Sequence, residues 1–318
     1  MLDNSKGNGI KESKASFMKK INTLLAYGLN DIVLCGGFGP GALDVYFELR
    51  RYYQINFSID AETNLKTDRK IDLEKIKLYL SQLIRFDDPK QHGIQQTKKF
   101  LEENHQTDWE KININGNALF IHPKVFHAGH FPSTAWFGSE LCNLLKNDSN
   151  FCEVGCGSGV ISCLVALANP KLQIIATDIN PYASENTKLN AEALGLQSRF
   201  TVLTGDVLDS IKSEAYFDAI FWALPFGFLD PGTEISLEEA QVFDPGYRAI
   251  RKFFQTAKHH LKPNGKILVG FSTDLGHLEL LEVLARECSI KLTIIKEKII
   301  KEDADVKFEI LEGRFVRF

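Results

Sequence analysis

The stretch Phe151-Cys-Glu-Val-Gly-Cys-Gly-Ser-Gly159 decides the fold of this chain. In it a short apolar run breaks into alternating glycines, and an apolar helical pattern follows over residues 160–168. A second apolar run ends on the carboxylate of Asp178, about twenty residues further on, as in nucleoside-binding strand–helix–strand units. In such a unit the glycines let the backbone approach the ligand, and the acid accepts both ribose hydroxyls. We therefore predict a nucleoside site at this turn.

The spacing of the glycines distinguishes between nucleoside cofactors. Gly155, Gly157 and Gly159 form the pattern G-x-G-x-G, and Val160 lies where a dinucleotide fingerprint would have its last glycine. This departure favours S-adenosylmethionine over NAD as the cofactor.

Size and composition are those of a globular enzyme with room for two domains. The chain has 318 residues, of which 44% are hydrophobic and 25% are charged. No apolar run reaches the ~18 residues of a membrane span, and the polar N-terminus lacks a signal-peptide core. The six cysteines include no C-x-x-C pair and no histidine at zinc spacing, so we expect reduced thiols, no metal site and a cytoplasmic location.

The charge balance bears on the class of partner. The net charge is −4, and neither half of the chain has the Lys/Arg excess that neutralisation of phosphates requires of a general nucleic-acid binder. We therefore expect a small-molecule partner rather than nucleic acid or a membrane. The sequence is also compatible with a homo-oligomer.

The pattern of elements divides the chain into two domains. Residues 1–115 are expected to form a mainly helical N-terminal domain, and residues 116–318 an α/β domain. N-terminal helices are expected over residues 13–29, 42–53, 72–86 and 91–103, and a strand over 118–122 leads into the second domain. Further strands are expected at 151–154, 173–178, 200–204, 217–222, 265–271, 292–300 and 306–310, with helices at 136–145, 160–168, 181–194, 246–261 and 275–287.

The last two of these strands are separated by a short charged loop, so they should form an antiparallel hairpin at the edge of the sheet. The alternation predicts a doubly wound, Rossmann-like sheet of about seven strands with an antiparallel last strand.

The second domain resembles the class I S-adenosylmethionine-dependent methyltransferases over about residues 118–318. Its segments follow the order of that family: Glu153–Gly159, Asp178-Ile-Asn-Pro181, Thr204-Gly-Asp206 and Ala223-Leu-Pro-Phe226. The layout is similar to the HemK-like branch, which methylates protein glutamine. That branch has Asn or Asp where this chain has Ala223, and the polar side chain there holds the amino group that is methylated. The resemblance makes residues 116–318 the catalytic domain and puts methylation of a planar amide or an adenine in doubt.

The resemblance also implies which residues hold the cofactor. Glu153 would contact the amino end of S-adenosylmethionine, Asp178 its ribose and Asp206 its adenine amino group. As alternatives, Glu153 caps local N–H groups and Asp206 caps a helix. The complete expected set is Glu153, Gly155, Gly157, Gly159, Asp178, Ile179, Asp206, Val207, Ala223 and Thr134.

The acceptor side is expected to follow the fourth strand of the sheet. Leu224, Pro225, Phe226 and Asp230 are the predicted substrate pocket. The long acidic segment 227–244 would be a lid for a cationic or amine substrate, or else a solvated surface with a helix over 236–242. His127, His130 and Tyr247 are the candidate catalytic residues, and the competing interpretation of the histidines is structural.

Together these features predict an S-adenosylmethionine-dependent methyltransferase (EC 2.1.1.-) that acts on a small molecule, for instance an amine. One alternative is a methyltransferase of a protein side chain or of RNA. Another uses the same cofactor to transfer or cyclise its aminocarboxypropyl group. A third is a non-catalytic cofactor-binding module, since a fold does not establish an activity.

Overall fold

The computed structural model describes residues 14–26, 32–35, 49, 57–60, 66–67, 70–71, 97–98, 101, 107–301 and 305–316. The chain divides into two compact units, Met1–Gln91 and His92–Phe318. No helix in the described ranges is both long and apolar enough to cross a membrane.

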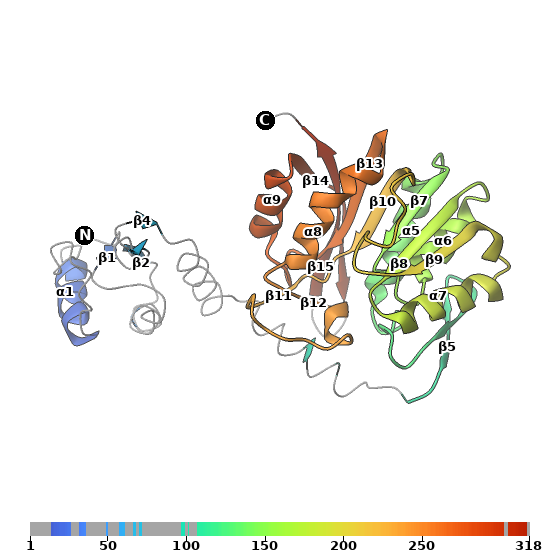
Figure 1. Ribbon diagram of the computed structural model, residues 1–318. Coiled ribbons are helices and arrows are strands. Elements are labelled where there is room, and N and C mark those ends of the chain that lie inside the picture. The colour runs from blue at the N-terminus through green and yellow to red at the C-terminus, as the bar shows by residue number, and fades with distance from the viewer. Residues whose placement is uncertain are drawn as a thin grey trace. The chain divides into compact units, whose positions relative to one another are not determined.

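The first unit contains helix α1 (Lys14–Ala26), whose Phe17 and Ile21 are fully buried. It also contains β1 (Ile32–Cys35) parallel to β2 (Phe57–Asp60), and β3 (Lys66–Thr67) antiparallel to β4 (Lys70–Ile71) (Figure 1). The helices expected over 42–53, 72–86 and 91–103 lie outside the described residues, apart from short pieces at 49, 97–98 and 101.

The second unit is built on a seven-stranded sheet in the order β14-β15-β13-β10-β7-β8-β9. Its strands are β7 (Asn150–Val154), β8 (Gln173–Asp178), β9 (Phe200–Thr204), β10 (Phe217–Ala223), β13 (Leu261–Phe271), β14 (Ile290–Lys301) and β15 (Asp305–Phe315). Strands β13, β10, β7, β8 and β9 are parallel, whereas β15 runs antiparallel to both β13 and β14. The predicted methyltransferase sheet with its antiparallel last strand is confirmed.

Two helical layers cover this sheet. Helices α5 (Pro132–Leu144), α6 (Val160–Ala168) and α7 (Pro181–Ala193) lie on one side, and α8 (Arg248–Ala257) and α9 (Leu278–Glu287) on the other (Figure 1). Helix α6 packs against α5, β8 and α7, which is why almost all of its side chains are apolar and buried. The hydrophobic core therefore extends from the turn after β7 into the layer formed by α5, α6 and α7.

A hairpin precedes α5 and supports the site. Strands β5 (Glu110–Ile114) and β6 (Asn117–Ile121) join at Asn115-Gly116, which both have positive φ, as a two-residue hairpin turn requires. The Asn190 side chain of α7 accepts from Phe120 N (2.7 Å) and donates to Ser158 O (2.8 Å). Because this amide bonds both β6 and the glycine turn, it holds the two segments side by side.

The segment after β10 contains a second small parallel pair. Strand β11 (Gly227–Leu229) pairs with β12 (Phe243–Pro245), and a single 3-10 turn, Glu239–Gln241, precedes β12. The helix expected over 236–242 is reduced to this turn. Ser236 and Glu239 cap each other, each side chain accepting the other's backbone N–H, and the chain then enters β12.

Candidate active site

A cavity of about 660 Å³ lies at the carboxyl ends of β7, β8 and β10. Ligands of doubly wound folds bind at this edge, because the loops that follow neighbouring parallel strands meet there. Its wall runs from the glycine turn after β7 to the segment after β10 and to β12. Of the predicted site residues, the wall includes Glu153, Gly155, Gly157, Asp178, Ile179, Asp206, Val207, Ala223, Thr134, Leu224, Pro225 and Phe226.

The glycine turn combines two physical requirements. A Cβ on Gly157 would meet nothing within 4 Å, and its φ of +55° favours glycine, so this position faces open space in the cavity. A Cβ on Gly155 would instead lie 2.5 Å from Trp222 Nε1. Gly155 is thus required by packing against β10, while Gly157 leaves room for a ligand. Gly159 caps α6 and is absent from the cavity wall among the described residues.

Asp178 ends β8 beside this turn. Its Oδ2 accepts Gly157 N and its Oδ1 accepts Asn180 N, both at 2.8 Å. Burial raises the pKa of this carboxyl, and the backbone N–H groups act in the opposite direction. The acid therefore orders the turn and also lines the cavity, where ribose hydroxyls would approach.

Glu153 is the most perturbed acid of the site. Its side chain is buried, and its Oε2 accepts the backbone N–H (3.0 Å) and the hydroxyl of Ser162. Burial raises the pKa of this carboxyl to about 8. A cation in the cavity would restore the charged form, since an opposite charge nearby favours ionisation. The amino group of S-adenosylmethionine is such a cation, so the donor set fits this cofactor.

The turn after β9, which is predicted to contact adenine, lines another part of the cavity. Val207 has a φ of 57°, which is strained for a β-branched residue, and its carbonyl accepts Thr177 Oγ1 at 2.8 Å. Asp206 is half-exposed and accepts from Lys252 Nζ at 2.6 Å, so this acid is ion-paired rather than a helix cap. Thr134 lines the cavity from the first turn of α5.

The acceptor end of the cavity is apolar and aromatic. Ala223, Leu224, Pro225 and Phe226 form one wall, and Phe243 of β12 lines the same cavity. Tyr247 is fully buried outside this wall. Its hydroxyl donates to Phe226 O (2.6 Å) and accepts His277 N (3.1 Å), so it holds the wall in place. Asp230 is absent from the lining among the described residues.

The two candidate histidines do not line the cavity, although their neighbours Phe126 and Ala128 do. The rings of His127 and His130 stack at 3.7 Å between centroids, and neither residue is part of the described cavity wall. His127 Nε2 lies 3.1 Å from Glu110 Oε2. Burial and the charge of His130 lower the pKa of His127. Glu110, His127 and His130 hold ligand atoms within 4.8 Å of one another and could hold a metal ion.

Two acidic residues of segment 227–244, Asp244 and Glu239, have structural partners. Asp244 is buried and accepts the N–H groups of Ala249 (3.2 Å) and Ile250 (2.9 Å) at the start of α8. Glu239 pairs with Lys98 (3.5 Å) and with Ser236. These two carboxylates stabilise segment 227–244 itself, so they are already bonded within the protein and do not indicate a cationic substrate.

The sequence interpretation missed several residues of the wall. Gln241, Phe243, Arg248 and Lys252 line the cavity although no local motif contains them. These residues reach the cavity because β12 pairs with β11 and helix α8 begins shortly after β12 ends. The only sequence signal was the unusual length of the segment between β10 and α8.

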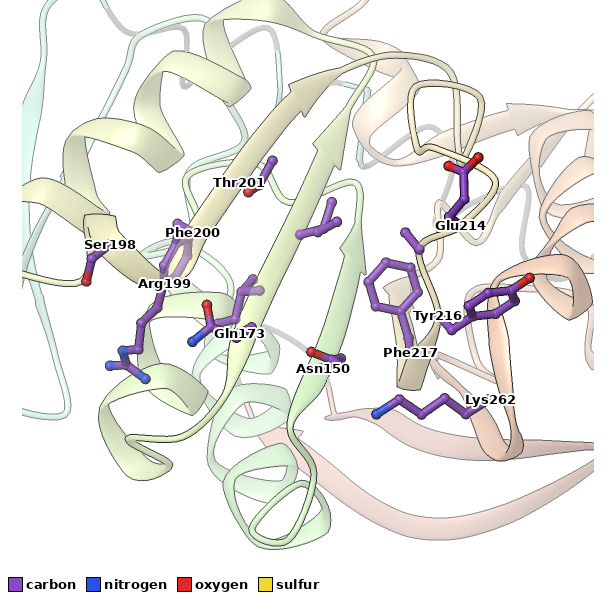
Figure 2. Close-up of a pocket in the computed structure, with 13 residues that line it drawn as sticks. Asn150, Gln173, Ser198, Arg199, Phe200, Thr201, Glu214, Tyr216, Phe217 and Lys262 are labelled. Atoms are coloured by element: carbon purple, nitrogen blue, oxygen red, sulfur yellow. The ribbon is translucent and has the colours of Figure 1, made fainter.

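A second cavity, of about 520 Å³, lies at the amino ends of β7–β10 (Figure 2). Its cations are already engaged. Arg199 donates to Asn169 O (2.9 Å) and Ala166 O (2.8 Å), and Lys262 pairs with Asp218 (2.8 Å). These contacts stabilise the end of α6 and the start of β10. The two side chains are therefore not free to bind an anionic ligand.

Comparison with known proteins identifies the relatives of this chain. The family model for the methyltransferase small domain matches residues 118–301. The chain is 24% identical over 283 residues to ribosomal RNA small subunit methyltransferase C of Haemophilus influenzae, covering 81% of this chain and 80% of that protein. The protein of the same name from Vibrio vulnificus is 27% identical over 191 residues, covering 58% of this chain and 50% of that protein.

Among solved structures, Trm5 of Methanocaldococcus jannaschii in complex with adenosine matches with a TM-score of 0.47 at 16% identity. The match covers 67% of this chain and 58% of that chain.

These relatives correct two predictions. The expected small-molecule acceptor, and the expectation that nucleic acid is not a partner, are contradicted because the relatives are named for action on ribosomal RNA. The expectation failed because net charge sums the whole surface, whereas recognition of RNA depends on where cations lie.

The cofactor and the enzyme class agree with the sequence prediction, and the family model covers more than half of the chain. The chain is an S-adenosylmethionine-dependent methyltransferase and belongs to the methyltransferase small domain family.

Proposed function

We propose that this chain transfers the methyl group of S-adenosylmethionine to RNA. The observation that carries the proposal is the match over 81% of the chain to a methyltransferase named for the RNA of the small ribosomal subunit. The HemK-like layout predicted from the sequence describes only the order of the motifs along the chain. The relatives named above favour RNA over a protein side chain as the substrate.

The form of the cavity supports this proposal. Its acceptor end combines Pro225, Phe226 and Phe243, and apolar and aromatic side chains of this kind suit an unstacked base. Arg248 lines the same cavity from α8 and is exposed, whereas Lys252 is ion-paired with Asp206 (2.6 Å) and Asp209 (2.5 Å). An exposed arginine on the same cavity as an aromatic wall suits a nucleotide, whose base is planar and whose phosphate is anionic.

The cofactor end is assigned residue by residue. Glu153 would pair with the amino group, Asp178 would accept the ribose hydroxyls, and the turn at Asp206-Val207 would contact adenine. Thr134, Ile179 and Ala223 complete the proposed contacts, with Gly155, Gly157 and Gly159 shaping the turn. When bound, the cofactor supplies a methyl group on a positively charged sulfur that is already activated for displacement.

The protein then has to orient the acceptor and exclude water. The wall at 223–226 is rigid for this purpose, because Leu224 N donates to Gly270 O (2.9 Å) and Tyr247 holds Phe226 O. Segment 227–244 covers the same cavity as a lid. We propose that residues 116–318 carry this reaction and that residues 1–115 contribute to the choice of RNA.

The experiment that tests the proposal supplies the protein with labelled S-adenosylmethionine and an unmodified transcript of small-subunit ribosomal RNA. We expect label in the RNA and S-adenosylhomocysteine as the product. Methylthioadenosine would instead mean that the aminocarboxypropyl group had moved. Turnover of a protein substrate or a small molecule, with no label in RNA, would overturn the proposal.

A ribosomal substrate also supports the cytoplasmic location expected from the cysteines. The five cysteines whose side chains are described are all free thiols.

A further inference from the structure

One of the three tryptophans is exposed at the start of the hairpin that precedes α5. Trp109, directly before β5, is 45% exposed, whereas Trp136 and Trp222 are each 8% exposed. A single exposed apolar side chain is common on a protein surface. The Trp109 ring is therefore informative only through the groups that surround it.

Trp109 belongs to an ordered group of three rings, Trp109, His122 and Tyr182, which we call the aromatic platform. Glu110 of β5 pairs with Ile121 of β6, and the residues just outside this pair, Trp109 and His122, meet edge to face at 4.8 Å between ring centroids. His122 in turn stacks on Tyr182 of α7, at 4.7 Å with 18° between the ring planes. The platform thus connects the β5–β6 hairpin to α7.

Hydrogen bonds fix the middle ring of the platform. His122 N donates to Asn186 Oδ1 (2.8 Å), and His122 Nδ1 accepts the backbone N–H of Lys124 (3.0 Å). The ring is therefore held in place before any ligand arrives. Such preorganisation lowers the loss of conformational entropy that accompanies binding.

A lysine places a positive charge on the same surface. Lys124 Nζ lies 4.7 Å from the centroid of the Tyr182 ring and 3.5 Å from its hydroxyl oxygen. Lys124 is exposed, and no carboxylate of the described residues forms an ion pair with it. The ring attracts the ammonium group without cancelling its charge, so Lys124 can also contact a phosphate.

The charge around the platform is mixed. Glu110 is exposed next to Trp109, and the exposed Glu185 of α7 acts electrostatically on His122. Net positive charge is therefore not what distinguishes this surface. We expect stacking on the exposed ring to contribute more to binding than phosphate contacts do.

The platform adjoins the wall of the cavity. Asn180 Nδ2 donates to Lys124 O (2.7 Å), and Asn180 Oδ1 accepts the backbone N–H of Tyr182 (3.0 Å). Asn180 and Val125, which follows Lys124, both line the cavity. A nucleotide that flanks one held in the cavity would therefore approach the platform.

We propose that the aromatic platform and Lys124 bind an unpaired nucleotide of RNA next to the one that is methylated. The inference rests on the proposed RNA methyltransferase function and adds a contact outside the cavity. The base stacks on the Trp109 ring, and Lys124 contacts a phosphate. Because every base has an aromatic face, this surface fits single-stranded RNA with little preference for sequence.

Replacing the exposed ring tests the stacking. Trp109→Ala in the full chain should raise Kd for a fluorescein-labelled single-stranded fragment of small-subunit ribosomal RNA, read by anisotropy, by about 5- to 150-fold. KM for RNA should rise in parallel. None of the three rings is part of the described cavity wall, so kcat and the affinity for S-adenosylmethionine should change by less than about threefold. Trp109→Phe keeps a ring and should retain most of the RNA affinity.

The salt dependence of binding separates the ring from the cation. Lys124→Gln removes one proposed phosphate contact. The slope of the logarithm of the RNA association constant against the logarithm of salt concentration should therefore decrease in size by about 0.7. Trp109→Ala should leave this slope unchanged, because stacking releases no counterions.

Tyr216→Ala is the matched control. Tyr216 is 52% exposed and directly precedes β10, so it lies at the amino ends of the parallel strands, at the opposite edge of the sheet from the cavity. This variant should bind and methylate RNA as the wild type does. The melting temperatures of all four variants should stay close to that of the wild type, since each replaced side chain is exposed.

The outcomes separate this inference from the function on which it rests. Unchanged Kd and KM in Trp109→Ala, with RNA methylated by the wild type, would overturn the inference and leave the RNA function standing. A wild-type dimer in sedimentation that dissociates in Trp109→Ala, with RNA affinity unchanged, would do the same and assign the platform to a second copy of the chain. Absence of any label in RNA with the wild type would overturn the proposed function and this inference with it.

Discussion

At the scale of single residues, Glu153 has the clearest electrostatic consequence. Burial raises the pKa of its carboxyl from 4.5 to about 8. Between these pH values the folded protein binds more protons than the unfolded chain. The stability contributed by the protonated carboxyl is therefore complete below pH 4.5 and is lost as the pH rises through about 8.

We expect the melting temperature of the cofactor-free wild type to fall relative to that of Glu153→Gln as the pH rises from 4.5 to about 8. The glutamine keeps the shape and does not titrate. Glu192→Gln, at an exposed position of α7, is the matched control and should follow the wild type. Parallel pH curves for wild type and Glu153→Gln would contradict the raised pKa.

Asp178 supports the cofactor at the same scale. Asp178→Ala removes the acceptor proposed for the ribose hydroxyls and also the partner of Gly157 N. We expect the affinity for S-adenosylmethionine to fall by about tenfold or more, since charge-assisted hydrogen bonds contribute ~1.5–3 kcal/mol each. Isothermal titration measures this loss. Asp209→Ala, which removes an exposed partner of Lys252, should bind normally; equal affinities in all three proteins would be the contrary result.

At the scale of elements, the site depends on the junction between β11, β12 and α8. Tyr247 lies at this junction with a φ of 49°, and its hydroxyl bridges the carbonyl of Phe226 and the N–H of His277. The sequence pattern made Tyr247 a catalytic candidate, whereas its burial outside the described wall indicates a positioning role.

Tyr247→Phe keeps the ring and removes both hydrogen bonds. We expect the free energy of unfolding to fall by about 1–3 kcal/mol, because two buried backbone groups lose their partner. The rate of methyl transfer should fall without a shift of its pH profile, and cofactor affinity should not change. A displaced pH profile with normal stability would instead make Tyr247 a proton-transfer group.

At the scale of the whole molecule, the proposed RNA substrate and the negative net charge together make a testable prediction. The chain carries −4 overall, yet its relatives are named for ribosomal RNA. If local Lys and Arg side chains contact phosphates, RNA binding releases counterions and weakens with salt.

We expect the logarithm of the RNA association constant of the full chain to fall linearly with the logarithm of salt concentration, by ~0.7–0.9 per phosphate contacted. Fluorescence anisotropy with a labelled RNA fragment gives this slope. Binding of S-adenosylmethionine alone, measured in the same buffers, is the control and should depend little on salt. A flat RNA curve would mean that phosphate contacts contribute nothing.

The sequence by itself determined the sheet, the cofactor and most of the predicted cofactor residues that line the cavity. Glycine spacing, an acid at the end of β8 and the alternation of apolar runs are local signals, because each depends on residues within a few turns of chain. Hairpin β5–β6 was missed although Asn115-Gly116 is a strong turn signal.

Only the tertiary structure decided the acceptor end of the cavity. The parallel pairing of β11 with β12 and the bond from the buried Tyr247 hydroxyl to Phe226 O join segments that are far apart in the sequence. Such contacts depend on how the chain closes on itself rather than on any local pattern. Burial then requires polar groups to find partners within the protein, as the Asp244 carboxylate does at the start of α8.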